Sequence, residues 1–329
     1  MSHQTAGVTL AEVQQPVIGQ LDQVTATLRD IVAADFPLIQ EVNGHLLQMK
    51  GKLFRPTLLL LSHQASGGHD PRAVRLAAVI ELIHLATLVH DDSVDHSALR
   101  RGMPTVNALF SHQVSVIMGD YLYSRAIIEL VGLGDLEPLR VLSRVTNEMT
   151  IGEMRQLAQY DALAFREEDY EVTIRAKTAS LLAGACETGA LLAGADAREA
   201  LRTYGDALGM AFQVCDDLLD YTEAESVTGK PSGNDLREHK VTLPLIAALR
   251  EMNPSERDKV AQLFSEAEPA DEQVLEVIAL VERCGGLEFA RNRALEWAEQ
   301  AEHSLQGLPP SPARDALHAA IAYAVERRS

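Results

Sequence analysis

Residues 82–107 read LIHLATLVHDDSVDHSALRRGMPTVN, and this stretch decides how the rest of the chain is interpreted. It runs an apolar helical segment into three aspartates, Asp91, Asp92 and Asp95, and then into the cations Arg100 and Arg101. Two carboxylates about 4 Å apart repel by roughly 4 kcal/mol at the effective dielectric of a protein surface. A positive partner is therefore expected beside these aspartates.

The segments around this stretch are predicted to be helical. Apolar residues recur at helical spacing and alternating β-branched runs are few, which predicts an all-α protein of about a dozen helices. Many alanines and only 5% aromatic residues suit close packing in a helical bundle. No low-complexity linker divides the chain, so residues 1–329 are predicted to form one domain. Three helix starts are marked by a capping residue followed by proline, at Asp70, Asn253 and Ser311.

Composition excludes several classes of protein. With 47 acidic residues against 29 basic ones the net charge is -18, which argues against a nucleic-acid binder or an anchor on anionic lipid. Cys186, Cys215 and Cys284 are far apart, so neither a disulfide framework nor a thiolate zinc site is predicted. The N-terminal residues show no signal-peptide pattern, and no apolar run is read as approaching the length of a membrane span. A cytoplasmic protein without a membrane anchor is expected.

The aspartate pattern returns in FQVCDDLLDY, residues 212–221, where Asp216, Asp217 and Asp220 follow another apolar helix. Residues four apart share one helix face, and a neighbour is displaced by only about 100°, so each triplet is expected to point into one volume. Carboxylates without thiolates suit a hard cation such as magnesium, completed by substrate phosphate oxygens. One triplet alone could equally be a solvated helix end, whereas two favour a shared metal site.

Basic residues gather beside these motifs. The loop of residues 223–240, interrupted by Gly229, Pro231 and Gly233, is a candidate lid. Each cation alone reads as a surface charge, but together they predict a diphosphate site. They are Lys52 and Arg55 in GKLFRP, Arg100 and Arg101 after the first triplet, Lys177 in AKTAS, and Lys230 and Lys240 in the loop.

These residues resemble the trans-isoprenyl diphosphate synthases, also called the polyprenyl synthetase family. DDSVDHSALRRGMPTVN resembles the first aspartate-rich motif of that family, FQVCDDLLDY the second, and GKPSGNDLREHKVTLPL the lid that follows. GKLFRP and ELIH resemble two further blocks, and the resemblance covers roughly residues 50–248. It implies a helical bundle around a central substrate cavity and a magnesium-dependent condensation of isopentenyl diphosphate with an allylic diphosphate such as geranyl, farnesyl or geranylgeranyl diphosphate.

The resemblance also implies a role for each motif residue. Magnesium would be held by Asp91, Asp92, Asp95, Asp216, Asp217 and Asp220; the allylic diphosphate by Arg100, Lys177, Lys230 and Lys240; and isopentenyl diphosphate by Lys52, Arg55, His84 and Arg101. Lys177, Thr178, Gln213 and Lys240 are the implied catalytic residues, and the oxygens of Thr178 and Gln213 would face the allylic cation. One position departs from the pattern: His239 stands where the family commonly has glycine, and it is expected to affect the lid and Lys240.

Product length is predicted from the positions four and five residues before the first aspartate. Short-product members of the family tend to carry an aromatic residue there, about one helical turn below the metals. Here the residues are Thr87 and Ala86, so the resemblance implies an open tunnel and a long-chain product, with a short-chain product as the alternative. Met118, Tyr121 or Met149 could close the tunnel earlier, although such residues are usually core.

Other readings remain at this stage. His84 and the HDD at residues 90–92 faintly resemble the HD phosphohydrolases, but that reading leaves the second triplet and the lid unexplained. A non-catalytic partner subunit of a heteromeric synthase is opposed by two complete triplets. Terpene cyclases generally lack the second triplet and the GKxxRP block. The resemblance further implies a homodimer, and release of a hydrophobic product could involve peripheral contact with a membrane.

Overall fold

The computed structural model describes residues 7–49, 51–158, 163–194, 197–222 and 232–326. These residues are helical apart from loops and one short hairpin, which confirms the predicted all-α class. Fourteen α-helices in the described residues have eight residues or more, close to the expected dozen. The hairpin pairs β1 (Leu99–Arg100) with β2 (Met103–Pro104) in antiparallel fashion. The helices are α1 (Leu10–Gln14), η1 (Gln15–Val17), α2 (Ile18–Ile31), α3 (Pro37–Gln48), α4 (Phe54–Ala65), α5 (Arg72–Val94), α6 (Val106–Leu109), α7 (His112–Gly132), α8 (Leu136–Leu157), α9 (Glu167–Ile174), η2 (Arg175–Ala179), α10 (Ser180–Leu192), α11 (Arg198–Thr222), α13 (Asn234–Arg237), α14 (Leu243–Glu251), α15 (Pro254–Ser265), α16 (Asp271–Arg283), α17 (Gly286–Ser304) and α18 (Pro312–Val325).

Two of the three predicted helix starts are confirmed. The Asn253 side chain accepts the Glu256 N–H, and the Glu256 side chain accepts the Asn253 N–H. A reciprocal cap of this kind stabilises a helix by about 1 kcal/mol. Ser311 caps α18 by accepting the Arg314 N–H. The Asp70 carboxylate accepts the Arg72 N–H, but α5 itself begins at Arg72, so that start was placed too early.

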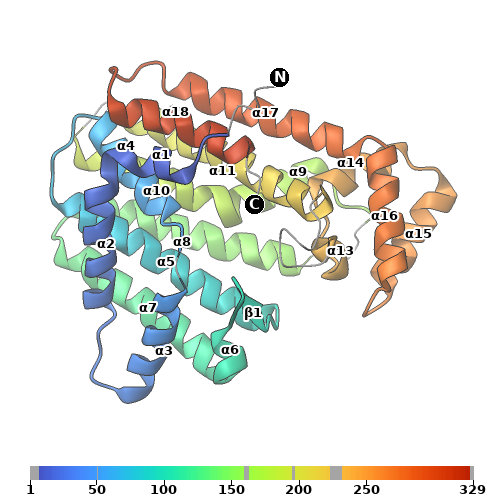
Figure 1. Cartoon of the computed structure of the whole chain (residues 1–329), viewed down its shortest axis with the longest axis horizontal. Coiled ribbons are helices and arrows are strands. Elements are labelled where there is room, and N and C mark those ends of the chain that lie inside the picture. Colours follow the sequence, from blue (N-terminus) through green and yellow to red (C-terminus); the bar gives the residue numbers. More distant parts are fainter. Residues whose placement is uncertain (1–6, 50, 159–162, 195–196, 223–231, 327–329) are drawn as a thin grey trace, which may run out of the picture.

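The long helices form a bundle with a smaller group of helices at one end (Figure 1). Helices α5, α8 and α10 cross the middle of the view, α17 and α18 lie along the top, and α15 and α16 stand at the right-hand end. Helix α5 packs against α4 and α7, while α10 packs against α4, α8 and α11. The two helices that carry the aspartate triplets, α5 and α11, are therefore both central elements.

The apolar core consists of two clusters of buried residues. The larger gathers residues of α1–α8, α10 and α18, and the smaller gathers residues of α9, α14, α15 and α16. Helix α11 contributes to both, with Leu208 in the larger cluster and Val214 in the smaller one, and α17 does the same with Ala301 and Ala290. Two long helices thus run through both clusters.

Helix α5 corrects one expectation from the sequence. Its 23 residues are long and apolar enough to cross a membrane by length and composition alone, contrary to the reading that no apolar run has such a length. Most of the apolar window is buried among other helices, as for Leu76, Ile80 and Leu82, none of which is exposed. A core helix of a soluble protein passes the same test.

Two glycines let the helices beside η2 approach closely. A Cβ at Gly152 on α8 would lie 2.7 Å from the backbone nitrogen of Lys177, and a Cβ at Gly209 on α11 would lie 2.6 Å from Cα of Ala179. No side chain fits at such distances, so glycine is required at both crossings. The segment η2 is a π-helix, a rare form that occurs frequently at functional sites. It is clamped between α8 and α11, which carry site residues of their own.

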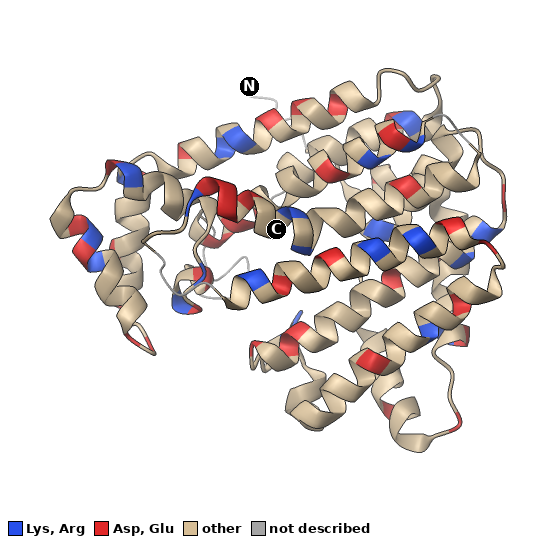
Figure 2. Ribbon diagram, turned by 180° about the vertical axis from the view of Figure 1, so that it is seen from behind, with Lys and Arg blue, Asp and Glu red and all other residues tan. Residues whose placement is uncertain are grey.

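The distribution of charge agrees with the acidic composition. Seen from behind, Lys and Arg are scattered among Asp and Glu along the helices and do not gather into one basic face on the described residues (Figure 2). A cluster of basic residues is therefore unusual in this protein and indicates a binding site for an anion.

Candidate active site

A cavity of about 750 Å³ opens where the two core clusters meet. Its apolar walls include Phe54, Met149 and Leu182 from the larger cluster or its edge and Tyr170 and Val241 from the smaller one. Most of the predicted site residues line it: Lys52, Arg55, His84, Thr87, Asp91, Asp95, Arg100, Arg101, Lys177, Thr178, Gln213, Asp216, Asp217 and Lys240. Ala86, Asp92 and Asp220 do not, and Lys230 lies outside the described residues.

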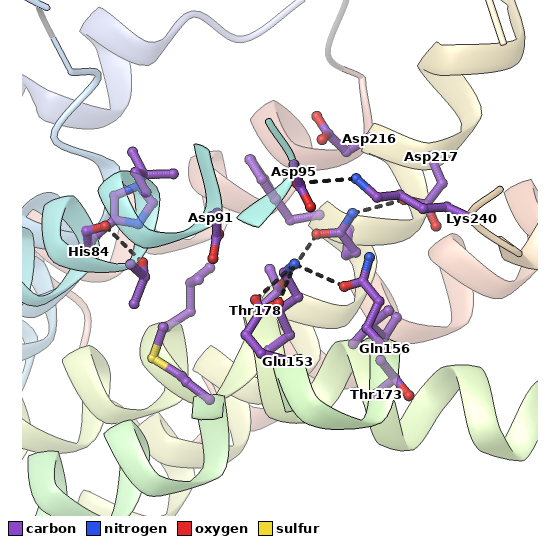
Figure 3. A pocket seen from close by; sticks show the side chains of 18 of the residues that line it. His84, Asp91, Asp95, Glu153, Gln156, Thr173, Thr178, Asp216, Asp217 and Lys240 are labelled. Atoms are coloured by element: carbon purple, nitrogen blue, oxygen red, sulfur yellow. Dashed lines mark hydrogen bonds and ion pairs between the residues drawn. The ribbon is translucent and has the colours of Figure 1, made fainter. Parts of the chain in front are cut away.

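The first triplet divides into two cavity residues and one structural ion pair. Asp91 and Asp95 face the cavity from the C-terminal end of α5 (Figure 3). The Asp95 N–H bonds to the Asp91 carbonyl there. Asp92 is buried and pairs with Arg100, whose Nη2 and Nε both lie 2.8 Å from Oδ1. The three carboxylates therefore do not all point into one volume, because the hairpin that follows brings Arg100 back onto Asp92.

The second triplet divides in a similar way. Asp216 and Asp217 line the cavity from α11, facing Asp95 across it (Figure 3). Asp217 is buried and accepts hydrogen bonds from the Tyr170 hydroxyl at 2.5 Å and from Nε2 of Gln213 at 2.8 Å. Asp220 instead accepts the backbone N–H groups of Asn234 and Asp235 at 3.1 and 3.0 Å, which places it at the N-terminus of α13.

Three carboxyl groups of the cavity have a raised pKa. Burial, followed by the nearby charge of Glu153, raises the pKa of Asp91 to about 7, and burial raises that of Asp217 to about 7. The pKa of Asp235, which also lines the cavity, is raised well above its usual range for the same reason. Within the described residues no three acidic, histidine or cysteine side chains converge closely enough to hold a metal by themselves. Hard oxygen donors on two facing helices fit divalent cations whose remaining ligands come from a substrate.

Lys177 is held by residues of α8. Its Nζ lies 2.8 Å from Oε1 of Glu153, 3.0 Å from Oε2 of the same side chain and 2.9 Å from Oε1 of Gln156. All three residues line the cavity. The close approach at Gly152 makes this contact possible, since it brings α8 against the backbone of η2.

Lys240 approaches the first triplet from the far side. Its Nζ lies 2.6 Å from Glu238 and 3.6 Å from Oδ2 of Asp95 (Figure 3). Although burial alone would lower its pKa, the bond to Glu238 and the charges of Asp95 and Asp235 raise the pKa above its usual value. Lys240 therefore stays charged at the mouth of the carboxylate cluster.

A second group of cations lies at the other end of the cavity. Nη1 of Arg55 lies 2.9 Å from Nε2 of His84, and because a guanidinium only donates, the imidazole must accept there and carry its proton on Nδ1. Burial and the charges of Arg55, Arg101 and Arg100 hold the pKa of His84 well below its usual range. Burial lowers the pKa of Arg55 to about 10, so it remains charged near neutral pH. A protonated His84 would be repelled by the neighbouring arginines, whereas the neutral imidazole is not. The neutral His84 can still donate its Nδ1–H to a diphosphate bound by those arginines.

A chain of hydrogen bonds connects the cavity wall to the second triplet. The Thr178 hydroxyl donates to Oε1 of Gln213 at 2.9 Å, and Nε2 of Gln213 donates to Oδ1 of Asp217 at 2.8 Å. When Asp217 is ionised its carboxylate only accepts, and this fixes the direction of both bonds in the chain. The lone pairs of the Thr178 oxygen are left for the cavity.

Of the residues predicted to affect product length, some line the cavity and others do not. Thr87 lines the cavity, and Met149 lines it from α8. Ala86 is buried in the larger core cluster and is not part of the wall. Met118 is buried elsewhere on α7, and Tyr121 donates to the Val32 carbonyl at 3.2 Å, so neither lines the cavity. Of the three candidate bulky residues, only Met149 is placed to limit a growing chain.

Several cavity residues were missed by the sequence analysis: Glu81, Glu153, Gln156, Tyr170 and Asp235. Glu81 is buried near Arg55 and Arg101, and although burial raises its pKa, those arginines act to lower it. Isolated acids at helical spacing look like a solvated face, which is why the pattern gave no signal. Glu81 stands in the ELIH block, three residues before His84, and that position was the one available clue.

The fold and this site define a class of protein. A polyprenyl synthetase family model matches residues 36–281, and the chain belongs to this family. That membership confirms the resemblance read from the motifs and replaces the phosphohydrolase alternative, whose required His90 lies outside the cavity.

Particular relatives cover nearly the whole chain. It is 36% identical over 323 residues to the octaprenyl diphosphate synthase of Escherichia coli (strain K12), covering 97% of this chain and 99% of that protein. It is 39% identical over 308 residues to an all-trans-nonaprenyl-diphosphate synthase (geranyl-diphosphate specific) of Rhodobacter capsulatus, covering 93% and 94%. A polyprenyl synthase from Caulobacter crescentus CB15, solved with calcium and isoprenyl diphosphate, superposes with a TM-score of 0.93 at 33% identity, covering 98% of this chain and 99% of that one.

Proposed function

We propose that this protein is a trans-polyprenyl diphosphate synthase that condenses isopentenyl diphosphate with an allylic diphosphate. The observation that carries the proposal is one cavity with carboxylates of both aspartate motifs between two separate groups of cations. Two anionic substrates need two such groups, because each diphosphate must be neutralised on its own. Relatives named as octaprenyl and nonaprenyl diphosphate synthases support the same activity.

The two groups of cations would hold different substrates. Arg100, Lys177 and Lys240 lie on the side of the carboxylates and would bind the allylic diphosphate, with Lys230 as a further predicted ligand. Arg55, His84, Arg101 and Lys52 would bind isopentenyl diphosphate, with the Nδ1–H of His84 as a donor. This division puts the leaving diphosphate beside the metal ligands and the attacking substrate away from them.

Magnesium is the proposed metal, and the solved relative that holds calcium with isoprenyl diphosphate supports a divalent cation. Asp91, Asp95, Asp216 and Asp217 face the cavity and would bind it, directly or through water, with Asp92 and Asp220 supporting them from behind. The ions would neutralise charge that develops on the departing diphosphate.

The chain's own residues would supply positioning and charge. When the allylic C–O bond breaks, its electron pair stays on the diphosphate oxygen, where Lys177 and Lys240 can balance the added charge. The Thr178 oxygen, turned toward the cavity by its bond to Gln213, would stabilise the allylic cation. The double bond of isopentenyl diphosphate then forms the new C–C bond, and the departed diphosphate takes the proton that is lost. No protein nucleophile is needed.

A long-chain product is the proposed outcome. Thr87 is the small residue that lines the wall below Asp91, so the cavity is not closed one turn beneath the carboxylates. The two curated relatives described above are named for products of eight and nine isoprene units. Met149 and Leu182 also line the cavity and would border a growing chain.

We further propose a cytoplasmic homodimer in which residues 1–329 form one prenyltransferase domain, with peripheral membrane contact during product release. Large apolar side chains exposed on α7 support the dimer: Ile117, Ile128 and Val131 are 64%, 55% and 62% exposed. At about 100° per residue these three lie within one narrow stripe of the helix.

The decisive experiment is turnover by the purified chain. The protein is incubated with magnesium, isopentenyl diphosphate and farnesyl diphosphate, and products are resolved by mass spectrometry. A ladder ending at six or more isoprene units supports the whole proposal. Products of four units or fewer would keep the synthase and refute the long chain, and no product with any allylic primer would favour a non-catalytic partner subunit.

A further inference from the structure

Four non-glycine residues of the described chain have a left-handed backbone, and all of them border the proposed site. Each is itself a predicted ligand or the chain neighbour of one. Side chains disfavour this conformation, which persists only where surrounding contacts enforce it and is often found at functional sites. The four are Leu53 (φ 49°), His96 (φ 52°), Arg101 (φ 52°) and His239 (φ 56°).

The left-handed backbone of His239 is accompanied by a contact of its side chain with α15. Its ring packs on Phe264 of α15, with 5.6 Å between ring centroids and an interplanar angle of 49°. Nε2 of His239 is buried and has no hydrogen-bond partner among the described residues, so the imidazole serves as a packing group rather than as a ligand. A glycine, common at this position in the family, would adopt the same backbone freely but could not make this contact.

The residues before His239 are also anchored to the helices behind them. A Cβ at Gly233 would lie 2.6 Å from Val274 of α16, and Arg237 pairs with Asp271 of the same helix at 2.7 Å. At the other side, Asp220 accepts the N–H groups at the start of α13. Residues 232–240 are thus held between α11 and the α15–α16 pair.

The contacts of residues 232–240 determine the position of Lys240. The left-handed turn at His239 reverses the chain so that the Lys240 N–H bonds to the Asp235 carbonyl at 2.7 Å. The side chain of Lys240 then points toward Asp95. We propose that His239 is a positioning residue: its left-handed backbone, locked by the ring contact with Phe264, aims Lys240 at the allylic diphosphate. This inference rests on the proposed function only in naming that ligand.

Matched substitutions separate the backbone from the ring. His239→Val, which tolerates a positive φ poorly, is expected to raise KM for the allylic diphosphate and lower kcat, each by about tenfold, while KM for isopentenyl diphosphate stays unchanged. His239→Asn, which tolerates that backbone, is expected to restore most of the loss. Phe264→Leu removes the ring contact and should fall between them. His303→Val makes the same chemical change at an exposed position within α17 and should match the wild type.

A double-mutant cycle with Lys240→Ala tests whether His239 acts through Lys240. Binding of inorganic pyrophosphate with magnesium, measured by calorimetry, is expected to weaken about tenfold from His239→Val alone, and not further when Lys240 is already alanine. An equal weakening in both backgrounds, or an equal rise in KM for both substrates, would overturn the proposal.

Amide hydrogen exchange at Lys240 gives a readout without turnover. It should accelerate in His239→Val and recover in His239→Asn, because the bond to Asp235 depends on the turn; unchanged exchange would refute the inference. A wild-type protein that binds pyrophosphate but forms no product would refute the proposed function and leave this inference standing.

Discussion

Nζ of Lys177 lies 2.8 Å from Oε1 of Glu153, so a cation expected to bind the allylic diphosphate already has an anionic partner on a neighbouring helix. Glu153 follows Gly152, the residue that lets α8 touch η2. Substrate must therefore compete with a carboxylate for Lys177. When it does, the released Glu153 carboxylate adds to the negative charge around Asp91.

Replacing Glu153 with glutamine should separate these two effects. The substituted side chain keeps an oxygen for Lys177 but loses the charge. We expect metal-free protein to bind inorganic pyrophosphate about fivefold more tightly and to need a higher magnesium concentration for half-maximal activity. Calorimetry and a magnesium titration measure the two quantities. Gln156→Leu, which removes only a neutral contact, is the control, and identical behaviour of the two variants would contradict this account.

Asp216 and Asp220 should respond differently to the same substitution. Asp216→Asn removes a carboxylate that faces the cavity and is expected to lower kcat by at least about a thousandfold. Asp220→Asn disturbs the hydrogen bonds at the start of α13, which should cost about 1 kcal/mol of unfolding free energy and lower kcat by roughly tenfold or less. Steady-state kinetics and denaturant unfolding of both variants make the comparison. A loss for Asp220→Asn as large as that for Asp216→Asn would show that Asp220 is a metal ligand.

Phenylalanine at two adjacent positions should have unlike consequences for the product. Thr87→Phe places a ring in the cavity wall and is expected to shorten the product to four isoprene units or fewer, with little change in stability. Ala86→Phe overfills the larger core cluster and should destabilise the fold by about 1–3 kcal/mol without a matching change in product. Mass spectrometry of products and thermal unfolding decide between them. Shortening by Ala86→Phe alone would mean that the cavity wall has been misassigned.

The pH dependence of stability in the absence of metal follows from two buried carboxyls. The pKa of Asp91 and of Asp217 is about 7 in the folded protein, against about 3.9 in an unfolded chain. The folded state therefore binds more protons between these values, and the stability that these groups contribute is present below about pH 4 and lost as pH rises through about 7.

We expect Tm measured in chelator to fall over this range, and Asp91→Asn to remove part of the fall. Added magnesium should oppose it above pH 7, where the carboxylates are charged. Scanning calorimetry from pH 5 to 8 measures both. The same pH profile in wild type and Asp91→Asn would contradict the assignment.

The exposed stripe on α7 predicts the oligomeric state. Ile117→Glu should convert a dimer into monomers at micromolar concentration, because it places a charge in the apolar contact. Leu275→Glu makes the same change at a residue of α16 that is 57% exposed, and it should leave the dimer intact. Light scattering after size-exclusion chromatography gives the mass of each variant. A monomeric wild type would refute the dimer.

The sequence was sufficient for the fold class and for many, but not all, of the residues that line the cavity. Helical periodicity predicted α5 and α11. The spacing of the triplets predicted that all six carboxylates would share one site, and four of them line the cavity, whereas Asp92 and Asp220 do not. These features are local, so a linear pattern can report them. The same is true of the caps at Asn253 and Ser311, whose partners lie three residues away.

The contacts that the sequence did not predict are made between segments that the path of the chain brings together. Asp92 pairs with Arg100 because a hairpin turns back onto α5, and Asp220 bonds to backbone groups 14 and 15 residues later. Glu153 faces Lys177 because a glycine lets two helices touch. No spacing rule within one helix reports contacts that are created by the path of the chain between helices.

The passage of α11 and α17 through both core clusters has a mechanical consequence. Asp91 and Asp95 stand on a helix of the larger cluster, whereas Asp216 and Asp217 stand on the part of α11 that packs in the smaller one. The separation of the two carboxylate pairs therefore depends on how the two clusters are held together, and α11 and α17 are the helices that contribute to both. A diphosphate bound between the two pairs would thus be held by residues of both clusters at once, so its binding site depends on the whole bundle and not on one local segment.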